Sequence, residues 1–154
     1  MQRNSDIIIS DTSCLILLYK IDELALLNEI ADKVFVTPVI FQEFGNKLPS
    51  WILIQEPKDK HYQKILEMDL DKGEASAIAL SLEIDNSILI IDDLKGRKLA
   101  EKLNLKYSGT FGLILKAKKS GIINSVIPIL DKIKKTNFRF SDKLFQLIVE
   151  QAGE

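Results

Sequence analysis

The chain has 154 residues, a formal net charge of −1, and 46% hydrophobic and 28% charged residues. This composition is ordinary for a globular domain, and a chain of this length buries about two thirds of its unfolded surface in one core. No apolar run approaches the roughly 20 residues that span a membrane, and the first six residues lack the apolar segment of a signal peptide. Disulfides and cysteine-based metal sites are excluded, because Cys14 is the only cysteine, and its apolar surroundings predict a buried, inert thiol. We therefore expect a single cytoplasmic domain over residues 1–154, without membrane association.

The first predicted strand, residues 7–10, contains three consecutive isoleucines, which is typical of a strand buried on both faces. Asp11 stands at its carboxyl end, and a helical segment follows at once. A second buried strand is predicted at 87–91, followed by Asp92 and Asp93. Shorter strands are predicted at 34–36, 51–55 and 105–107. Helices are predicted at 13–20, 23–31, 38–44, 59–68, 71–82, 94–103, 109–120, 125–135 and 142–151.

This alternation of strands and helices predicts a three-layer α/β/α fold with a central, mostly parallel sheet of four or five strands. An open sheet of this kind holds its ligand outside the carboxyl ends of its strands. Asp11 and the Asp92–Asp93 pair therefore follow strands at the edge where a ligand site is expected.

Acidic and basic residues are unevenly distributed along the chain. Residues 1–94 contain 8 Lys and Arg against 17 Asp and Glu, whereas residues 95–154 contain 13 against 5. Halves of opposite sign suit an acidic, metal-dependent site beside a basic surface that binds a polyanion. Solvated helix faces that merely differ in charge explain the same pattern equally well.

Four carboxylates stand at places where an α/β sheet gathers its chemistry. Asp11 and Asp93 follow the two buried strands, and Glu43 and Glu74 lie on predicted helices. Taken singly, Asp11, Asp93 and Glu74 are better explained as helix caps or as part of a capping box. Glu43 differs, because its position on the helical wheel falls within the apolar arc, so we expect its side chain either to be buried or to face the site.

The four acids together favour a metal site over four separate caps. Two carboxylates about 4 Å apart repel each other by about 4 kcal/mol at an effective dielectric constant of about 20. Such a cluster persists only with a proton or a bound cation, and all-oxygen ligands select Mg²⁺ or Mn²⁺. His61 is the only histidine, so it has no histidine partner for a zinc site, and no serine–histidine–aspartate arrangement or glycine-rich phosphate loop is evident.

Four short motifs and one longer segment resemble the PIN domain. They are Asp-Thr-Ser at 11–13, Pro-x-x-x-x-Glu at 38–43, Gly-Glu-Ala at 73–75, Asp-Asp-x-x-x-Arg at 92–97, and the segment 108–122. The closest likeness is to the compact prokaryotic branch related to VapC-type toxin nucleases. The resemblance extends from residue 7 to about residue 153.

The resemblance implies a ribonuclease that uses Mg²⁺ or Mn²⁺ to hydrolyse single-stranded RNA, and that serves as the toxin of a toxin–antitoxin pair. Its first three acids correspond to Asp11, Glu43 and Glu74. The fourth is Asp92 or Asp93, and we favour Asp93, with Asp92 as a further ligand. The residues implied as hydrogen-bonding groups at the site are Thr12, Ser13 and Thr110. The residues proposed to contact RNA are Lys95, Arg97, Lys98, Lys116, Lys118 and Lys119.

The resemblance also implies partners. Relatives of the VapC type are usually homodimers that are silenced by a small antitoxin filling the acidic groove. The apolar helices at 13–18 and 23–30 are candidates for the dimer surface, although they suit the core equally well. The family often has a threonine two residues before its last acid, and here that position is Ile91.

Two other readings remain. An aspartyl-phosphate phosphatase or receiver fits poorly, because the first motif has Ser13 where such a phosphatase needs a second aspartate, and because the acidic pair comes late in the chain. A non-catalytic module that keeps the fold and binds RNA or a partner protein is the stronger alternative.

Overall fold

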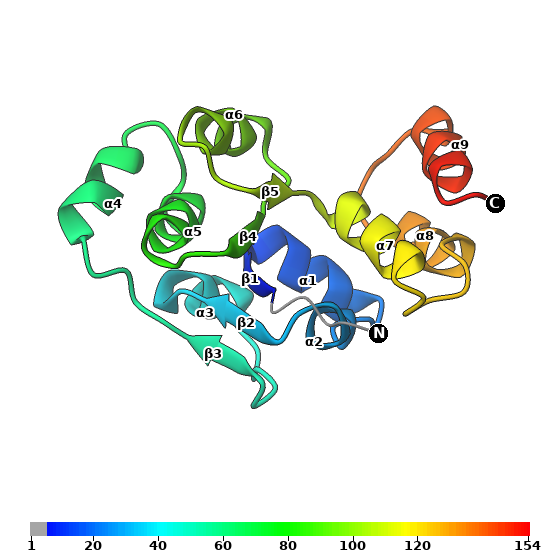
Figure 1. The fold of residues 1–154 in the computed structure, drawn as a ribbon, viewed down its shortest axis with the longest axis horizontal. Helices are drawn as coiled ribbons and strands as arrows, with labels where there is room; N and C mark the ends of the chain where they lie inside the picture. Colours follow the sequence, from blue (N-terminus) through cyan, green and yellow to red (C-terminus); the bar gives the residue numbers. More distant parts are fainter. Residues whose placement is uncertain (1–5) are drawn as a thin grey trace.

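A parallel five-stranded sheet forms the centre of the computed structural model, which describes residues 6–154 (Figure 1). Its strands lie in the order β3-β2-β1-β4-β5, and every pair of neighbours is parallel. The strands are β1 (Ile7–Ser10), β2 (Lys33–Val36), β3 (Ile52–Ile54), β4 (Ser87–Ile90) and β5 (Tyr107–Ser108). The predicted parallel sheet is confirmed. The expectation about a signal peptide concerns mostly residues 1–5, which lie outside the described part of the chain.

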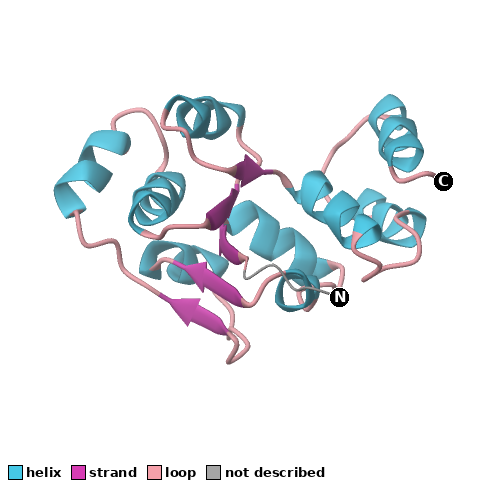
Figure 2. Cartoon of the chain, viewed as in Figure 1, coloured by secondary structure: helices cyan, strands magenta, loops and turns pink. Residues whose placement is uncertain are grey.

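Helices cover both sides of the sheet, which confirms the three-layer α/β/α arrangement (Figure 2). Helix α5 packs on β1 and β4, and α2 packs on β2. The helices are α1 (Thr12–Lys20), α2 (Leu26–Ile30), α3 (Pro38–Phe44), α4 (Lys60–Leu66), α5 (Lys72–Glu83), α6 (Leu94–Lys102), α7 (Thr110–Lys119), α8 (Ile127–Lys134) and α9 (Asp142–Gln151).

Local sequence signals set the helix boundaries near the candidate acids. Thr37 caps α3 by accepting a hydrogen bond from the Ile40 N–H at 3.2 Å, and Pro38 occupies the first turn. Gly45 ends the same helix in the left-handed conformation, with φ of 72°. Asp71 caps α5 in the same manner as Thr37 caps α3. These caps fix where α3 and α5 begin and end, and therefore where Glu43 and Glu74 lie.

Helices α1 and α2 contribute mainly to the core. Leu15, Leu18 and Leu27 are fully buried within the described chain. The two helices are separated by a turn in which Asp22 has a positive φ of 59°. Cys14 is fully buried beside them, and burial raises the pKa of its thiol, as expected for an inert cysteine.

The last three helices form a group beside β5 (Figure 1). The final residue, Glu154, ties this group together. Its carboxylate accepts hydrogen bonds from the Val126 N–H at 2.8 Å and from Lys118 Nζ at 3.2 Å, and it also contacts the Ser125 hydroxyl. Within residues 6–154, every helix is too short or too polar to cross a lipid bilayer.

Candidate functional site

The carboxyl ends of β1 and β4 lie side by side and bring Asp11 next to Asp92. Ser10 pairs with Ile90 in the register of the two strands. The Asp11 N–H donates to the Ile90 carbonyl at 3.0 Å, and the Asp92 N–H donates to Asp11 Oδ2 at 3.1 Å. The two segments that the sequence analysis placed at the ligand edge of the sheet are therefore in direct contact.

Asp11 is a buried acid with unusual electrostatics. Its side chain is 3% exposed, and Oδ1 caps α1 by accepting a hydrogen bond from the Cys14 N–H at 2.9 Å. Burial, followed by the charge of Asp92, raises the pKa of Asp11 from 3.8 to about 7, although its two backbone hydrogen bonds act in the opposite direction. Asp11 is therefore both a helix cap and an acid that is costly to ionise without a cation.

Glu43 lies in the last turn of α3, and its carboxylate is next to the first residue of α1. Thr12 Oγ1 donates a 2.6 Å hydrogen bond to Glu43 Oε1. Of the two expectations for Glu43, a buried side chain or one that faces the site, burial is wrong, because Glu43 is exposed. Its position on the helical wheel is apolar, but α3 ends two residues later at Gly45, so the last turn projects beyond the core. The Glu43 carboxylate instead accepts its hydrogen bond from Thr12, at the start of α1.

Gly73 passes close to the Glu43 carboxylate. A Cβ atom added at Gly73 would lie 2.2 Å from Glu43 Oε1, well inside van der Waals contact. The absence of a side chain at this position brings α5 close to α3. A buried hydrogen bond of 2.7 Å between Thr37 and Ser76 joins the same two helices.

Glu74 is the most strongly perturbed acid of the group. Its N–H donates to Asp71 Oδ1 at 2.8 Å, and its Oε2 atom is buried without a hydrogen-bond partner within the described residues. Burial, then Asp71, then Asp93 raises the pKa of Glu74 to about 9. A buried oxygen without a partner is a rare and costly feature, and a proton or a cation would satisfy it.

Asp71 adjoins the acidic cluster, although its place in the sequence predicted only a helix cap. Its charge also raises the pKa of Asp11, so it belongs electrostatically to the same cluster. The sequence offered one sign of this role, because Asp71 stands three residues before Glu74. That spacing is also typical of a helix cap, so it did not distinguish the two roles.

Asp93 and Asp92 have different environments. Asp93 is exposed and caps α6 by accepting a hydrogen bond from the Gly96 N–H at 3.1 Å. Asp92 is half-buried, and both of its carboxylate oxygens accept hydrogen bonds from Thr110, at 2.8 Å from the N–H and 2.6 Å from the hydroxyl.

The three predicted hydrogen-bonding residues differ in whether they contact the acids. Thr12 and Thr110 contact acids of the cluster directly. Ser13 is exposed and makes no hydrogen bond through its side chain within residues 6–154. Ile91 packs against Gly96, where an added Cβ would lie 2.4 Å from Ile91 Cδ1, so an apolar contact occupies the position where the family often has threonine.

Three of the six predicted RNA-contacting residues have partners within the protein, and three do not within the described range. Lys116 forms a 2.9 Å ion pair with Asp6, and Lys118 binds Glu154. Arg97 turns inward, and its Nε donates to the Ile91 carbonyl at 2.9 Å. The others are exposed and make no ion pair or hydrogen bond through their side chains within the described range: Lys95, Lys98 and Lys119.

The acids fit a hard divalent cation in their chemistry. They offer only carboxylate oxygens, which suit Mg²⁺ or Mn²⁺. The raised pKa values of Asp11 and Glu74 mean that their ionised forms are unfavourable without a nearby cation, and the Glu74 Oε2 atom has no hydrogen-bond partner within the described residues. Within residues 6–154, however, no three His, Cys, Asp or Glu side chains are already grouped to hold one ion.

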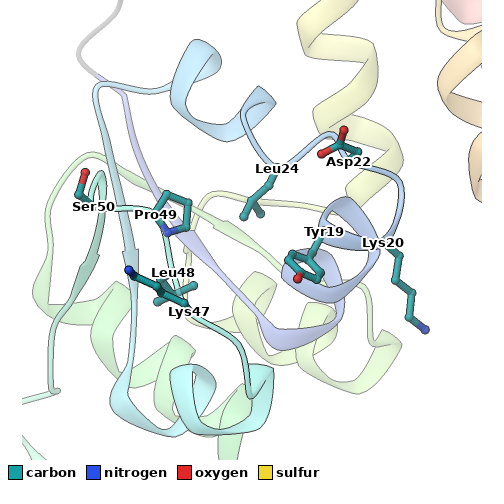
Figure 3. A pocket seen from close by; sticks show the side chains of 8 residues that line it. All are labelled: Tyr19, Lys20, Asp22, Leu24, Lys47, Leu48, Pro49 and Ser50. Carbon is teal, nitrogen blue, oxygen red and sulfur yellow. The ribbon is translucent and has the colours of Figure 1, made fainter.

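A separate hollow of about 800 Å³ lies between the end of α1 and the loop from α3 to β3 (Figure 3). Tyr19, Leu24 and Leu48 supply its apolar lining, and Lys20 and Lys47 stand at its rim. The carboxylates of the candidate site are not among its lining residues. This hollow is therefore distinct from the acidic cluster.

A parallel sheet between two helical layers, with acids at the carboxyl edge of its central strands, is consistent with a PIN-like fold. A family model described as the PIN domain matches residues 7–154, nearly the whole chain. The chain therefore belongs to the PIN-domain family. PIN domains are generally nucleases, bind nucleic acid and usually use divalent metals. A comparison with curated proteins gave no match.

Proposed function

We propose that this protein is a Mg²⁺- or Mn²⁺-dependent endoribonuclease that hydrolyses single-stranded RNA. The single observation that supports this most strongly is the gathering of acids at the carboxyl edge of the sheet, where Asp92 adjoins Asp11 and the Glu74 Oε2 atom is buried without a hydrogen-bond partner within the described residues. A protein that needs these residues only as caps gains nothing from gathering further acids around them. A bound cation would replace the protons and stabilise the ionised cluster.

Asp11 and Asp93 would hold the ion directly, and Glu43 and Glu74 would bind it or its water ligands. The chemistry that such an ion supplies when bound is activation of water and neutralisation of charge on the phosphate. Thr12 would hold Glu43 in position through its hydrogen bond to Oε1. In the overall reaction, the water oxygen bonds to phosphorus, the P–O3′ bond breaks, and a proton goes to O3′. The products carry a 5′-phosphate and a 3′-hydroxyl.

Cleavage of end-labelled single-stranded RNA by the purified protein tests this proposal. We expect cleavage with Mn²⁺ or Mg²⁺, no cleavage with EDTA, and 5′-phosphate ends on the products. Cleavage that persists in EDTA, or products with 2′,3′-cyclic phosphate ends, would contradict it.

The toxin role rests on the resemblance of residues 108–122 to the VapC-related branch, and with it come a homodimer, a small antitoxin and a cytoplasmic location. The neighbouring open reading frame is the informative observation. A small protein with a DNA-binding motif that inhibits cleavage when added to the nuclease would support the role. A neighbouring gene product without effect on cleavage would oppose it.

One observation favours a second candidate, a non-catalytic PIN module that binds RNA or a partner protein. Within the described chain, three potential ligands are not preassembled around one point. A calorimetric titration separates the two candidates, because a catalytic centre should bind Mn²⁺ and a non-catalytic module should not. Mn²⁺ binding that disappears in Asp11→Asn would exclude the second candidate.

A further inference from the structure

We propose that Asp92 is a positioning residue that, together with Thr110 and Arg97, clamps one peptide unit against Asp11. This proposal rests on the proposed function for its consequence in catalysis, but its geometry can be tested in the metal-free protein. It assigns Asp92 a different role from metal ligation, which the sequence suggested for it.

The first arm of the clamp is the contact between Asp92 and the beginning of α7. Thr110 is fully buried and is the first residue of that helix. Its N–H donates to Asp92 Oδ1 at 2.8 Å, and its hydroxyl donates to Asp92 Oδ2 at 2.6 Å. Both carboxylate oxygens are therefore engaged by one residue, with geometry typical of charge-assisted hydrogen bonds. The free N–H groups at a helix start also favour a carboxylate at this point.

The second arm is Arg97, which binds the backbone rather than facing solvent. Its Nε donates to the Ile91 carbonyl at 2.9 Å, and its Nη2 lies 3.8 Å from Asp92 Oδ1. Gly109 leaves the space that this side chain fills, because an added Cβ there would lie 1.7 Å from Arg97 Nη2. The glycine is required for space rather than for backbone conformation, since its φ is −99°.

The two arms act on the same peptide unit. The Ile91 carbonyl and the Asp92 N–H belong to one planar amide. Arg97 holds the oxygen end, the Asp92 side chain anchors the following residue, and the N–H end donates to Asp11 Oδ2 at 3.1 Å. The orientation of the Asp11 carboxylate is thus set by a peptide whose own orientation is fixed from both sides.

Substitutions at Thr110 and Asp92 distinguish a positioning role of Asp92 from metal ligation by Asp92. Thr110→Val removes the hydroxyl donor and keeps the shape, and Thr110→Ser restores the hydroxyl. Asp92→Asn removes the charge, but its amide can still accept from the Thr110 N–H and donate to the Thr110 hydroxyl. If Asp92 is a clamp, Thr110→Val weakens Mn²⁺ binding about tenfold, Thr110→Ser restores it, and Asp92→Asn costs less than Thr110→Val. If Asp92 is a ligand, the order reverses, and Asp92→Asn loses Mn²⁺ binding while Thr110→Val has little effect.

Amide hydrogen exchange in the metal-free protein gives a second readout that does not depend on activity. We expect the Asp92 N–H to exchange about tenfold faster in Thr110→Val, which corresponds to weakening one hydrogen bond, and at the wild-type rate in Thr110→Ser. Arg97→Met tests the other arm if Thr110→Val does not fold, and it should accelerate the same amide. Unchanged exchange in these variants would overturn the clamp. Absence of Mn²⁺ binding and RNA cleavage in the wild-type protein would instead overturn the proposed function, and the exchange data would still decide the clamp.

Discussion

Thr12, in the first turn of α1, donates a 2.6 Å hydrogen bond to Glu43, in the last turn of α3. The bond joins residues that lie 31 positions apart and connects the start of α1 to the end of α3. Because Glu43 is exposed, Thr12 is the group that holds its carboxylate in one orientation. This contact distinguishes Thr12 from Ser13, whose side chain is exposed and makes no comparable bond within residues 6–154.

Thr12→Val should therefore lower kcat/KM for RNA cleavage by about ten- to a hundredfold, since a hydrogen bond to a charged group contributes about 1.5–3 kcal/mol. Thr12→Ser keeps the hydroxyl and should remain close to the wild type. Steady-state kinetics with Mn²⁺ measures both. Equal activity of the valine and serine variants would show that Thr12 merely begins the helix.

Gly73→Ala should reduce RNA cleavage without lowering the stability of the fold. Alanine is favoured over glycine in a helix by about 1 kcal/mol, so the thermal unfolding midpoint should not fall. The new Cβ would nevertheless lie 2.2 Å from the present position of Glu43 Oε1, so the exposed Glu43 carboxylate would have to move. We expect reduced cleavage without loss of stability.

Gly112→Ala in α7 is the matched control for Gly73→Ala, because its Cβ would meet only the Ser108 side chain. Cleavage by the control should stay near the wild-type rate. If the two alanine variants are equally active, the position of Glu43 does not matter for the reaction.

The raised pKa of Asp11 predicts a pH dependence of stability in the absence of metal. Between 3.8 and about 7 the folded state binds more protons at this group than the unfolded state does. The free energy of unfolding contributed by Asp11 is therefore fully present below pH 4 and is lost as pH rises through 7. Asp11→Asn should lack this loss, so wild type should become less stable relative to the variant as pH rises.

Urea unfolding in EDTA at pH 5 and pH 8 measures this difference. Asp131→Asn, a substitution of an exposed acid on α8, serves as the control and should follow the wild type. A difference between wild type and Asp11→Asn that stays constant with pH would contradict the buried, protonated state of Asp11.

Lys95 and Lys98 on α6 are exposed and have no ion-pair partner within residues 6–154, unlike Lys116 and Lys118. If both bind phosphates, replacing both with alanine should weaken RNA binding. It should also reduce the slope of log affinity against log salt by about 1.4, at about 0.7 per phosphate for a single strand. Fluorescence anisotropy across a salt series measures the slope.

Lys60→Ala with Lys64→Ala on α4 is the control for this pair, since it removes two lysines from a helix that does not contribute to the acidic cluster. Its slope should match that of the wild type. An unchanged slope in the α6 double variant would remove α6 from the RNA-binding surface.

Much of the fold could be predicted from the sequence because its signals are local. The isoleucine run of β1, the Thr37–Pro38 helix start and the Gly45 helix end each depend on a few neighbouring residues. The parallel sheet followed from the alternation of strands with helices. The same local reasoning left α1 and α2 open between core and dimer surface, because apolar helices look alike in both settings.

The contacts within the site could not be predicted in the same way, because they join distant segments. The pairing of Asp92 with Thr110 spans 18 positions, and that of Asp92 with Asp11 spans 81. The helical wheel predicted the wrong environment for Glu43, since a wheel does not show where a helix leaves the core. Arg97 was expected at the RNA surface because it is basic, whereas its Nε donates a hydrogen bond to the Ile91 carbonyl.

Cleavage of single-stranded RNA in Mn²⁺ by wild type, Asp11→Asn and Asp131→Asn tests the central claim most directly. Loss of a carboxylate that helps to hold the ion removes several kcal/mol of charge stabilisation, so Asp11→Asn should be slower by about a hundredfold or more. Asp131→Asn should cleave at the wild-type rate. Cleavage by Asp11→Asn at the wild-type rate would contradict the assignment of this acidic cluster as a metal-dependent ribonuclease centre.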